Sequence, residues 1–375
     1  MIPFNKPYLS GNELEYIREA VASGRISGDG IFTKKCHEFF ETRYGFQKCL
    51  LTTSCTHALE MAAILIDIQP GDEVIMPSYT FVSTANAFVL RGARLVFCDS
   101  REDHPGINED GIEELITPKT KAIVPVHYAG IACDMDKIMS LANKYNLYVV
   151  EDAAQAIDSF YTDKNGEKKP LGGIGHLAAF SFNETKNIVS GEGGMLVINC
   201  SQFNERAEII REKGTNRSKF FRGEVDRYGW VDIGSSFLPS DIIAAFLYAQ
   251  LEKLEVIQLK RKEIWQYYFE KLIPMAEKGF QLPFIPKYAT NNAHMFYIVC
   301  NSLNERTTLI NQLKSNGILS VFHYNSLHHS PFYKGIKDER EMPFADLYTE
   351  RLLRLPFYYE LLKSDQDKIL NQLLS

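Results

Sequence analysis

Short apolar segments alternate with amphipathic segments along the first half of the chain. The apolar segments have the length and the content of branched residues that are typical of buried strands. We predict strands at Lys48 to Thr52, Glu73 to Met76, Arg94 to Cys98, Lys121 to Val126 and Tyr148 to Val150. Helical patterns follow at Ser54 to Ile64, Thr80 to Leu90, Ile112 to Ile116 and Met135 to Tyr145. Strands that alternate with helices predict a mostly parallel sheet of the α/β class.

The pattern changes near residue 200. Two more strands are predicted at His176 to Phe182 and Gly194 to Asn199, after a polar insertion that carries a turn signal at Asp163 to Gly166. A helix from Phe203 to Lys213 then leads into a polar loop, Gly214 to Ser236. A compact domain rarely keeps so long a loop without a function. A helical stretch from Ser240 to about Leu272 follows.

The last hundred residues predict a smaller α+β unit. Its predicted elements are strands at Met295 to Cys300 and Ile318 to Phe322, and helices at Arg306 to Asn316 and Asp365 to Leu374. We therefore predict a large α/β domain over residues 1–250 and a small C-terminal domain over residues 251–375.

Composition excludes several classes of protein. With 375 residues, 45% of them hydrophobic, the chain is far too apolar to be disordered. The net charge of −6 is spread evenly, which argues against broad nucleic-acid binding. The first residues lack the pattern of a signal peptide, and no apolar run reaches the roughly 18 residues of a membrane span. Seven scattered cysteines without a C-x-x-C pair predict free thiols and no zinc site. We expect a cytoplasmic protein.

Three predicted strands end in residues that carry chemistry. Asp152 follows the strand at Tyr148 to Val150, Lys186 follows Phe182, and Ser54 with Cys55 and Thr56 follows Thr52. Each has an ordinary explanation on its own, as a helix cap or a surface lysine. Together they form the set that pyridoxal phosphate requires: an amine for its aldehyde, an anion for its ring nitrogen and N–H donors for its phosphate. The sequence therefore predicts a pyridoxal phosphate site.

Two other signals are weaker. Gly173 to Ala178 fits the dinucleotide motif G-x-G-x-x-A but precedes a strand instead of following one, so an oxidoreductase is a distant alternative. The histidines His323, His328 and His329 lack the spacing of a metal-binding motif and have no acidic residue beside them in the sequence. They are better explained as substrate contacts or surface residues.

Four motifs occur in one order along the chain. They are Gly71 to Phe81, Glu151 to Gln155, Ser181 to Asn187 and Gly191 to Gly194. In this order and spacing they resemble the nucleotide-sugar aminotransferases of the DegT/DnrJ/StrS family, and the likeness runs from Ile2 to Pro356. The resemblance implies the fold type I architecture of aspartate aminotransferase, pyridoxal phosphate as cofactor with pyridoxamine phosphate as intermediate, and a homodimer with shared active sites.

The resemblance also implies a role for individual residues. Lys186 is the lysine that bonds the cofactor, and Asp152 pairs with the ring nitrogen. The residues implied around the rest of the cofactor are Ser54, Cys55, Thr56, Phe81, Gln155, Ser181, Asn183 and Ser236. Implied substrate contacts are Arg217, His323, Tyr324 and His328. Many members have histidine where this chain has Asn183, and asparagine where it has Ser236, which is expected to reach the neighbouring subunit's cofactor.

The motifs at Pro77 to Phe88, Val126 to Gly130 and Arg211 to Ser218 resemble members that use L-glutamate to aminate a dTDP-4-keto-6-deoxy sugar. A lysine at position 186 favours amino transfer over dehydration, because related dehydratases carry histidine there. The alternatives are amination at C3 or of a UDP-sugar, and a regulator that keeps the fold without turnover.

Overall fold

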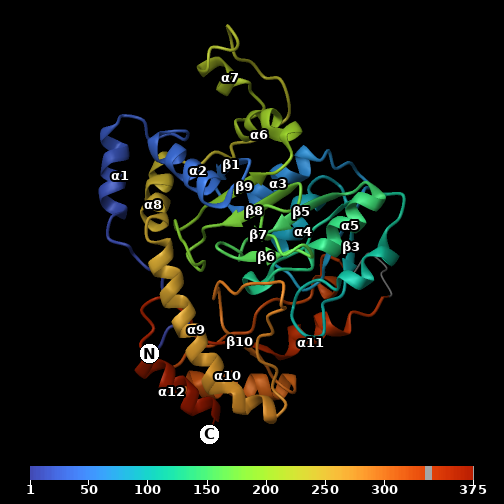
Figure 1. The fold of residues 1–375 in the computed structure, drawn as a ribbon, viewed down its shortest axis with the longest axis vertical. Helices are drawn as coiled ribbons and strands as arrows, with labels where there is room; N and C mark the ends of the chain where they lie inside the picture. The colour runs from blue at the N-terminus through green and yellow to red at the C-terminus, as the bar shows by residue number, and fades with distance from the viewer. Residues whose placement is uncertain (334–339, 375) are drawn as a thin grey trace.

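The computed structural model describes residues 1–333 and 340–374. Its centre is a seven-stranded sheet in the order β1-β9-β8-β5-β4-β2-β3 (Figure 1). The strands are β1 (Lys48–Thr52), β2 (Glu73–Pro77), β3 (Arg94–Cys98), β4 (Thr120–Ile123), β5 (Tyr148–Asp152), β8 (Leu177–Ser181) and β9 (Gly194–Ile198). Strand β9 is antiparallel to both β1 and β8, and the other pairings are parallel. The other six strands therefore run in one direction, as the sequence predicts for an α/β fold.

Helices cover both faces of this sheet. The helices in this part of the chain are α1 (Glu13–Ala22), α2 (Ile31–Tyr44), α3 (Cys55–Leu65), α4 (Val82–Val89), α5 (Met135–Tyr145), α6 (Asn204–Arg211), α7 (Arg217–Phe221) and α8 (Asp241–Leu251), of which α7 projects away from the sheet. One apolar core joins the sheet to α3, α4 and α6, and a second joins the opposite face to α2, α5 and α8. Buried side chains alternate between the two cores along the strands, since successive residues of a strand face opposite sides.

A third core is formed by one side of the long helix α9 (Leu254–Glu277) and the C-terminal elements packed against it. It contains β10 (Tyr297–Val299), α10 (Leu303–Ser315), β11 (Leu352–Arg354) and α12 (Lys363–Leu374), while α11 (Pro343–Arg351) packs on the first core. The N-terminus joins this region, because Ile2 bridges Ile318. The division of the chain at residue 250 stays a prediction. Among the described residues, no helix has both the length and the apolar composition to cross a membrane.

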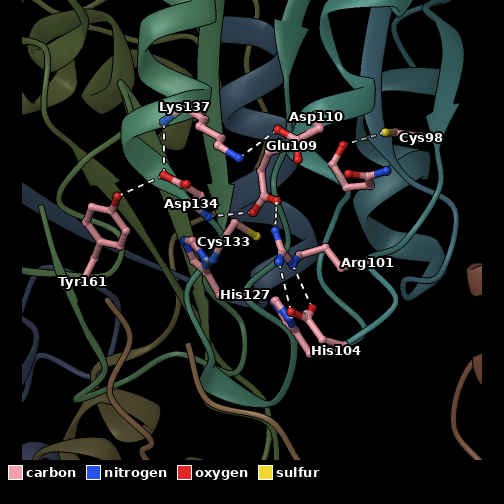
Figure 2. Close-up of polar contacts among 12 residues, drawn as sticks. Cys98, Arg101, His104, Glu109, Asp110, His127, Cys133, Asp134, Lys137 and Tyr161 are labelled. Carbon is pink, nitrogen blue, oxygen red and sulfur yellow. Dashed lines mark hydrogen bonds and ion pairs between the residues drawn. The ribbon is translucent and has the colours of Figure 1, made fainter. Parts of the chain in front are cut away.

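A polar cluster fixes the loop that follows β3 onto the start of α5 (Figure 2). Arg101 pairs with the buried carboxylate of Glu109 at 3.1 Å, and the other oxygen of Glu109 accepts a hydrogen bond from the backbone of Asp134 at 2.7 Å. Lys137 pairs with Asp110 at 2.8 Å. A buried carboxylate is tolerated only when paired in this way, so the cluster is explained by its structural role.

Four predicted elements differ from the structure. The stretch from Ser240 to Leu272 is two helices, α8 and α9, because the chain turns at Lys253 where the sequence has no glycine or proline to mark a break. Residues 318–322 form isolated bridges and no strand, since Ile318 pairs with Ile2 and Val321 with Arg354. The predicted helix at residues 112–116 is replaced by short 3-10 turns.

The fourth difference is the polar insertion, which contains a two-stranded hairpin of β6 (Phe160–Thr162) and β7 (Lys168–Pro170) around the predicted turn. The helices α1, α2 and α11 and the strand β11 were not predicted, nor was α7, which lies within the predicted loop from Gly214 to Ser236.

Candidate active site

A cavity of about 630 Å³ opens at the carboxyl ends of the sheet strands. The ends of β5 and β8 and the first turns of α3 and α4 bound it, and segments from the C-terminal region close it. Among the lining residues are Ser54, Cys55, Thr56, Phe81, Asp152, Gln155, Ser181, Asn183, Lys186, His323 and Tyr324. Ligands of open α/β sheets bind at this edge. The structure therefore brings eleven of the predicted residues into one cavity.

One end of the cavity is formed by the start of α3. The side chain of Ser54 caps the helix by accepting a hydrogen bond from the backbone N–H of His57 at 3.1 Å. The backbone N–H groups of Cys55 and Thr56 have no acceptor among the described residues. Strand β9 passes so close that a Cβ on Gly194 would lie 2.3 Å from the nitrogen of Cys55, which explains the glycine. Unused N–H groups at a helix start form an anion site.

Asp152 ends β5 with its carboxylate held on two sides. Its Oδ2 accepts a hydrogen bond from the hydroxyl of Thr84 at 2.6 Å, and its Oδ1 accepts one from the backbone of Ala154 at 3.1 Å. Thr84 lies in α4, and its hydroxyl also lies 2.9 Å from that of Thr80. The carboxylate is therefore fixed in orientation within the cavity. The hydrogen bond from the backbone of Ala154 is the helix-capping contact that would explain Asp152 without any ligand.

Lys186 lies in a closed loop between β8 and β9. The loop is held by backbone hydrogen bonds from Phe182 to Gly193 and from Glu184 to Gly191, both at 2.9 Å. Burial lowers the pKa of the Lys186 amine, and the nearby Asp152 carboxylate opposes that shift only in part. An amine with a lowered pKa in a cavity is suited to act as a nucleophile or a base.

Aromatic and amide groups form the wall beside these residues. Gln155 accepts a hydrogen bond from the backbone of Ala129 at 2.6 Å and donates one to the hydroxyl of Tyr324 at 2.9 Å. One amide hydrogen of Gln155 remains for a ligand. The rings of His323 and Tyr324 stack at 3.6 Å between centroids, and Phe81, which is 54% exposed, lies 5.9 Å from Tyr324. A flat ring can stack on Phe81.

Glu151, the neighbour of Asp152, faces away from the cavity. Its buried carboxylate pairs with His127 at 2.9 Å and accepts backbone hydrogen bonds from Gly172, Ile174 and Gly175. The glycine-rich segment that fits a dinucleotide motif therefore surrounds a side chain of its own chain. This observation gives no support to the oxidoreductase alternative.

Three predicted residues lie outside the cavity. Ser236 is exposed and bridges Glu212, while Arg217 lines a second, charged cavity near α6. The Nδ1 atom of His328 lies 2.6 Å from the hydroxyl of Ser78. The sequence shows no acidic residue beside His328 and His329, but the fold brings Asp346 within 3.4 Å of His328 and 3.2 Å of His329. Asp346 comes from the distant helix α11, so the sequence around the two histidines gives no sign of it.

The sequence interpretation missed several lining residues. They include Phe4, Asn5, Ser83, Thr84, Glu192, His294 and Arg354. The buried imidazole of His294 donates a hydrogen bond from Nδ1 to the amide oxygen of Asn187 at 2.9 Å, and burial holds its pKa well below the ordinary value. Phe4 and Arg354 lie near the two ends of the region, Ile2 to Pro356, that resembles the family. That resemblance was the one sequence signal that could have indicated them.

The residues present fit pyridoxal phosphate. The unused N–H groups at the start of α3 suit a phosphate, the oriented carboxylate of Asp152 suits a ring nitrogen, and the amine of Lys186 suits an aldehyde. All three lie on one cavity, and an aromatic side chain, Phe81, is exposed in its wall. This donor set is chemically complete for the cofactor.

Known proteins are similar to this chain in both sequence and fold. The profile of the DegT/DnrJ/EryC1/StrS aminotransferase family matches residues 7–374. A Methanocaldococcus jannaschii protein, MJ1066, is 33% identical over 99% of this chain and 96% of its own length. The aminotransferase TlmJ from Streptoalloteichus hindustanus superposes with a TM-score of 0.90 at 29% identity, covering 100% of this chain and 98% of that one. The putative sugar aminotransferase Spr1654 from Streptococcus pneumoniae, in its PLP form, superposes with a TM-score of 0.89 at 26% identity. The match covers 99% of this chain and 97% of that one.

The chain belongs to the DegT/DnrJ/EryC1/StrS aminotransferase family. It has the fold type I architecture and is a pyridoxal phosphate-dependent sugar aminotransferase. The family, the fold class and the cofactor that the sequence indicates are thereby confirmed.

Proposed function

We propose that the protein transfers the amino group of L-glutamate to a dTDP-4-keto-6-deoxyhexose and forms dTDP-4-amino-4,6-dideoxygalactose for surface polysaccharide synthesis. The observation that carries the proposal is the single cavity that holds both the Lys186 amine and the oriented Asp152 carboxylate. The motifs at residues 77–88, 126–130 and 211–218 support the choice of sugar.

Lys186 is the proton carrier in this proposal. When bound, pyridoxal phosphate supplies an electron sink that stabilises negative charge at the donor's α-carbon. The Lys186 amine would remove the proton from that α-carbon in the first half-reaction, and it would deliver a proton to C4 of the sugar in the second. Its pKa, lowered mainly by burial, favours the neutral amine that a base requires. Asp152 would hold the ring nitrogen, and Gln155 would contact the ring hydroxyl.

A second copy of the chain is part of the proposal. The segment 214–236, with α7, projects away from the sheet at the top of Figure 1. It exposes large apolar side chains: Phe221 at 64%, Tyr228 at 53%, Trp230 at 82% and Val231 at 55%. Exposed apolar groups clustered on a projection are typical of an interface. We propose a homodimer in which this segment, including Ser236 and Arg217, reaches the neighbouring subunit's cavity.

Subunit mixing tests the shared site. Lys186→Ala and a deletion within residues 214–236 are each expected to be inactive, and hybrid dimers have one intact site. With random exchange about half the dimers are hybrids, so about a quarter of wild-type activity should return. No recovery, with exchange confirmed by native mass spectrometry, contradicts the shared site.

The proposed activity is tested with the purified protein, L-glutamate and a panel of dTDP- and UDP-keto-sugars. We expect only the dTDP-4-keto-6-deoxy sugar to turn over efficiently, with no turnover by Lys186→Ala. A product aminated at C3, or a preference for a UDP-sugar, would replace the proposed substrate. If the protein binds the cofactor but the cofactor reacts neither with glutamate nor with any sugar, the result would favour a regulator without turnover.

A further inference from the structure

Two adjacent histidines and one aspartate gather beside α11, outside the active-site cavity. His328 and His329 lie in a single 3-10 turn, η5 (Leu327–His329), and Asp346 lies in the first turn of α11. Nε2 of His328 is 3.4 Å from Oδ1 of Asp346, and Nε2 of His329 is 3.2 Å from Oδ2. The ligand atoms of the three side chains lie within 4.8 Å of one another. Each imidazole therefore faces its own oxygen of one carboxylate.

The fold fixes the turn that carries the histidines. The backbone N–H of Leu327 donates to the carbonyl of Ser78 at 2.9 Å, and the hydroxyl of Ser326 lies 2.6 Å from that of Thr349 in α11. The hydroxyl of Ser78 lies 2.6 Å from Nδ1 of His328. Histidines that bind metals usually have their second ring nitrogen hydrogen-bonded in this way, because the contact sets the tautomer and the ring orientation. An Nδ1–H that donates to Ser78 leaves the lone pair of Nε2 facing Asp346.

Hydrogen bonds within the cluster do not account for the whole carboxylate of Asp346. His329 can donate from Nε2 to Oδ2. Oδ1 is shielded from solvent and accepts no hydrogen bond among the described residues, although Nε2 of His328 is its neighbour. A shielded carboxylate oxygen without a donor is costly, so this oxygen needs a positive partner. A cation between the three side chains would supply it.

The donor atoms and their spacing select the kind of cation. Zinc binds imidazole nitrogens and carboxylate oxygens at about 2.0 to 2.2 Å, and tetrahedral angles then place neighbouring ligand atoms about 3.4 Å apart. The two measured separations are close to that spacing. Magnesium and calcium prefer oxygen ligands, so two imidazoles beside one carboxylate favour a transition metal. The side chain of His329 is 66% exposed, so solvent can reach the remaining ligand position.

We propose that His328, His329 and Asp346 bind a divalent transition-metal ion, for which zinc is the best match, with water as the fourth ligand. The sequence favours substrate contacts or surface positions for these histidines, because their acidic partner is distant along the chain. The ion ties η5 to α11. Tyr324, which lines the active-site cavity, lies four residues before His328, so the ion braces the segment that leaves the cavity wall. Its role is structural, and no step of amino transfer passes through it.

The zinc content of the tag-free holoenzyme tests the site. The protein is dialysed against buffered free Zn²⁺, and the bound zinc is counted by inductively coupled plasma mass spectrometry. Wild type is expected to bind one zinc ion per chain. His329→Asn should weaken that binding about a hundredfold, since it removes a direct ligand. The exposure of this side chain lets the variant fold. Asp346→Asn, which removes the charged ligand, should weaken zinc binding at least as much.

A matched control is Asp103→Asn. Asp103 lies 2.8 Å from Nδ1 of His104, but the guanidinium of Arg101 already donates to both of its oxygens. Among the described residues no further ligand joins this pair to make a metal-binding group, so zinc binding should be unchanged. Zinc that survives both His329→Asn and Asp346→Asn is held by other groups, such as cysteine thiols, and overturns the inference. Wild type that binds no zinc, or that loses it to an equal concentration of Mg²⁺, overturns it too.

Thermal unfolding gives a second measurement. An ion that binds only the folded chain stabilises it, so added Zn²⁺ should raise the Tm of wild type and of Asp103→Asn but not that of His329→Asn. An equal rise in all three proteins would place the binding elsewhere and contradict the assignment. Neither measurement depends on turnover, so the inference stands or falls independently of the proposed function.

Discussion

The hydroxyl of Thr84 donates a hydrogen bond of 2.6 Å to Oδ2 of Asp152. This bond joins the first helical turns after β2 to the end of β5, two elements that are far apart in the sequence. Together with the backbone hydrogen bond from Ala154 it sets the direction of the carboxylate. Thr84 therefore positions Asp152, the group that we propose to pair with the cofactor's ring nitrogen.

Thr84→Val should lower kcat about tenfold, because it removes one hydrogen bond to a charged group while keeping the shape of the side chain. Thr84→Ser should restore most of the activity, since it returns the hydroxyl. Steady-state kinetics measures kcat of both variants, and the visible spectrum shows whether each variant binds the cofactor. Equal loss of activity in the valine and serine variants would show that Thr84 contributes by packing alone.

Asp152→Asn should keep bound cofactor but lose most of its activity. A neutral amide cannot hold the ring nitrogen protonated, so the electron sink weakens. We expect a loss in kcat of about a thousandfold, comparable to other single electrostatic groups in active sites. A rate near that of wild type would mean that Asp152 is only a helix cap.

Lys186 should capture the cofactor at lower pH than an ordinary lysine does. Burial lowers its pKa from the ordinary 10.5, and the neutral amine is the form that attacks an aldehyde. The rate at which apoprotein binds pyridoxal phosphate should therefore rise with pH and level off below pH 10.5. Stopped-flow absorbance measures this rate. A rate still rising at that pH would contradict the lowered pKa.

Glu151 should stabilise the fold in a pH-dependent way. Burial alone would raise its pKa, but the hydrogen bonds from His127 and from the backbone of Gly175 and Gly172 outweigh burial, and the pKa lies below the ordinary 4.5. The folded state thus binds this proton more weakly than the unfolded state. The stabilisation is complete above pH 4.5 and is lost as the pH falls through the lower, folded pKa.

Glu151→Gln should accordingly lower the free energy of unfolding at pH 7 by about 3 kcal/mol, because it breaks a buried pair. The difference between variant and wild type should shrink below pH 4.5. Urea unfolding at several pH values measures both quantities. A difference that is constant with pH would show that the carboxylate charge is not what stabilises the loop at Gly172 to Gly175.

The sheet was predictable because its strands carry an unambiguous local signal. Segments such as Lys48–Thr52 and Arg94–Cys98 are short, apolar and flanked by polar turns, and their bounds agree with β1 and β3. Residues 318–322 have the same local pattern but pair with Ile2 and Arg354. That outcome depends on contacts between the two ends of the chain, which a local pattern does not contain.

The candidate site was predictable where its residues follow strands directly. Asp152, Ser54 and Lys186 stand at or just after strand ends, so the topology alone brings them to one edge. Thr84 lies inside a helix, and Arg354 lies at the end of a short strand in the C-terminal region. Their importance comes from partners that are distant in sequence, such as Asp152 for Thr84, so only the folded chain shows it.

We propose that nitrogen passes from L-glutamate to C4 of a dTDP-linked sugar, with Lys186 as the proton carrier. The most direct measurement is incubation of the protein with ¹⁵N-labelled L-glutamate and dTDP-4-keto-6-deoxyglucose, followed by mass spectrometry and NMR of the sugar product. We predict ¹⁵N bonded to C4 in the galacto configuration, and no label in the product with Lys186→Ala. Label at another carbon, an unlabelled sugar, or labelled product from Lys186→Ala would contradict the account.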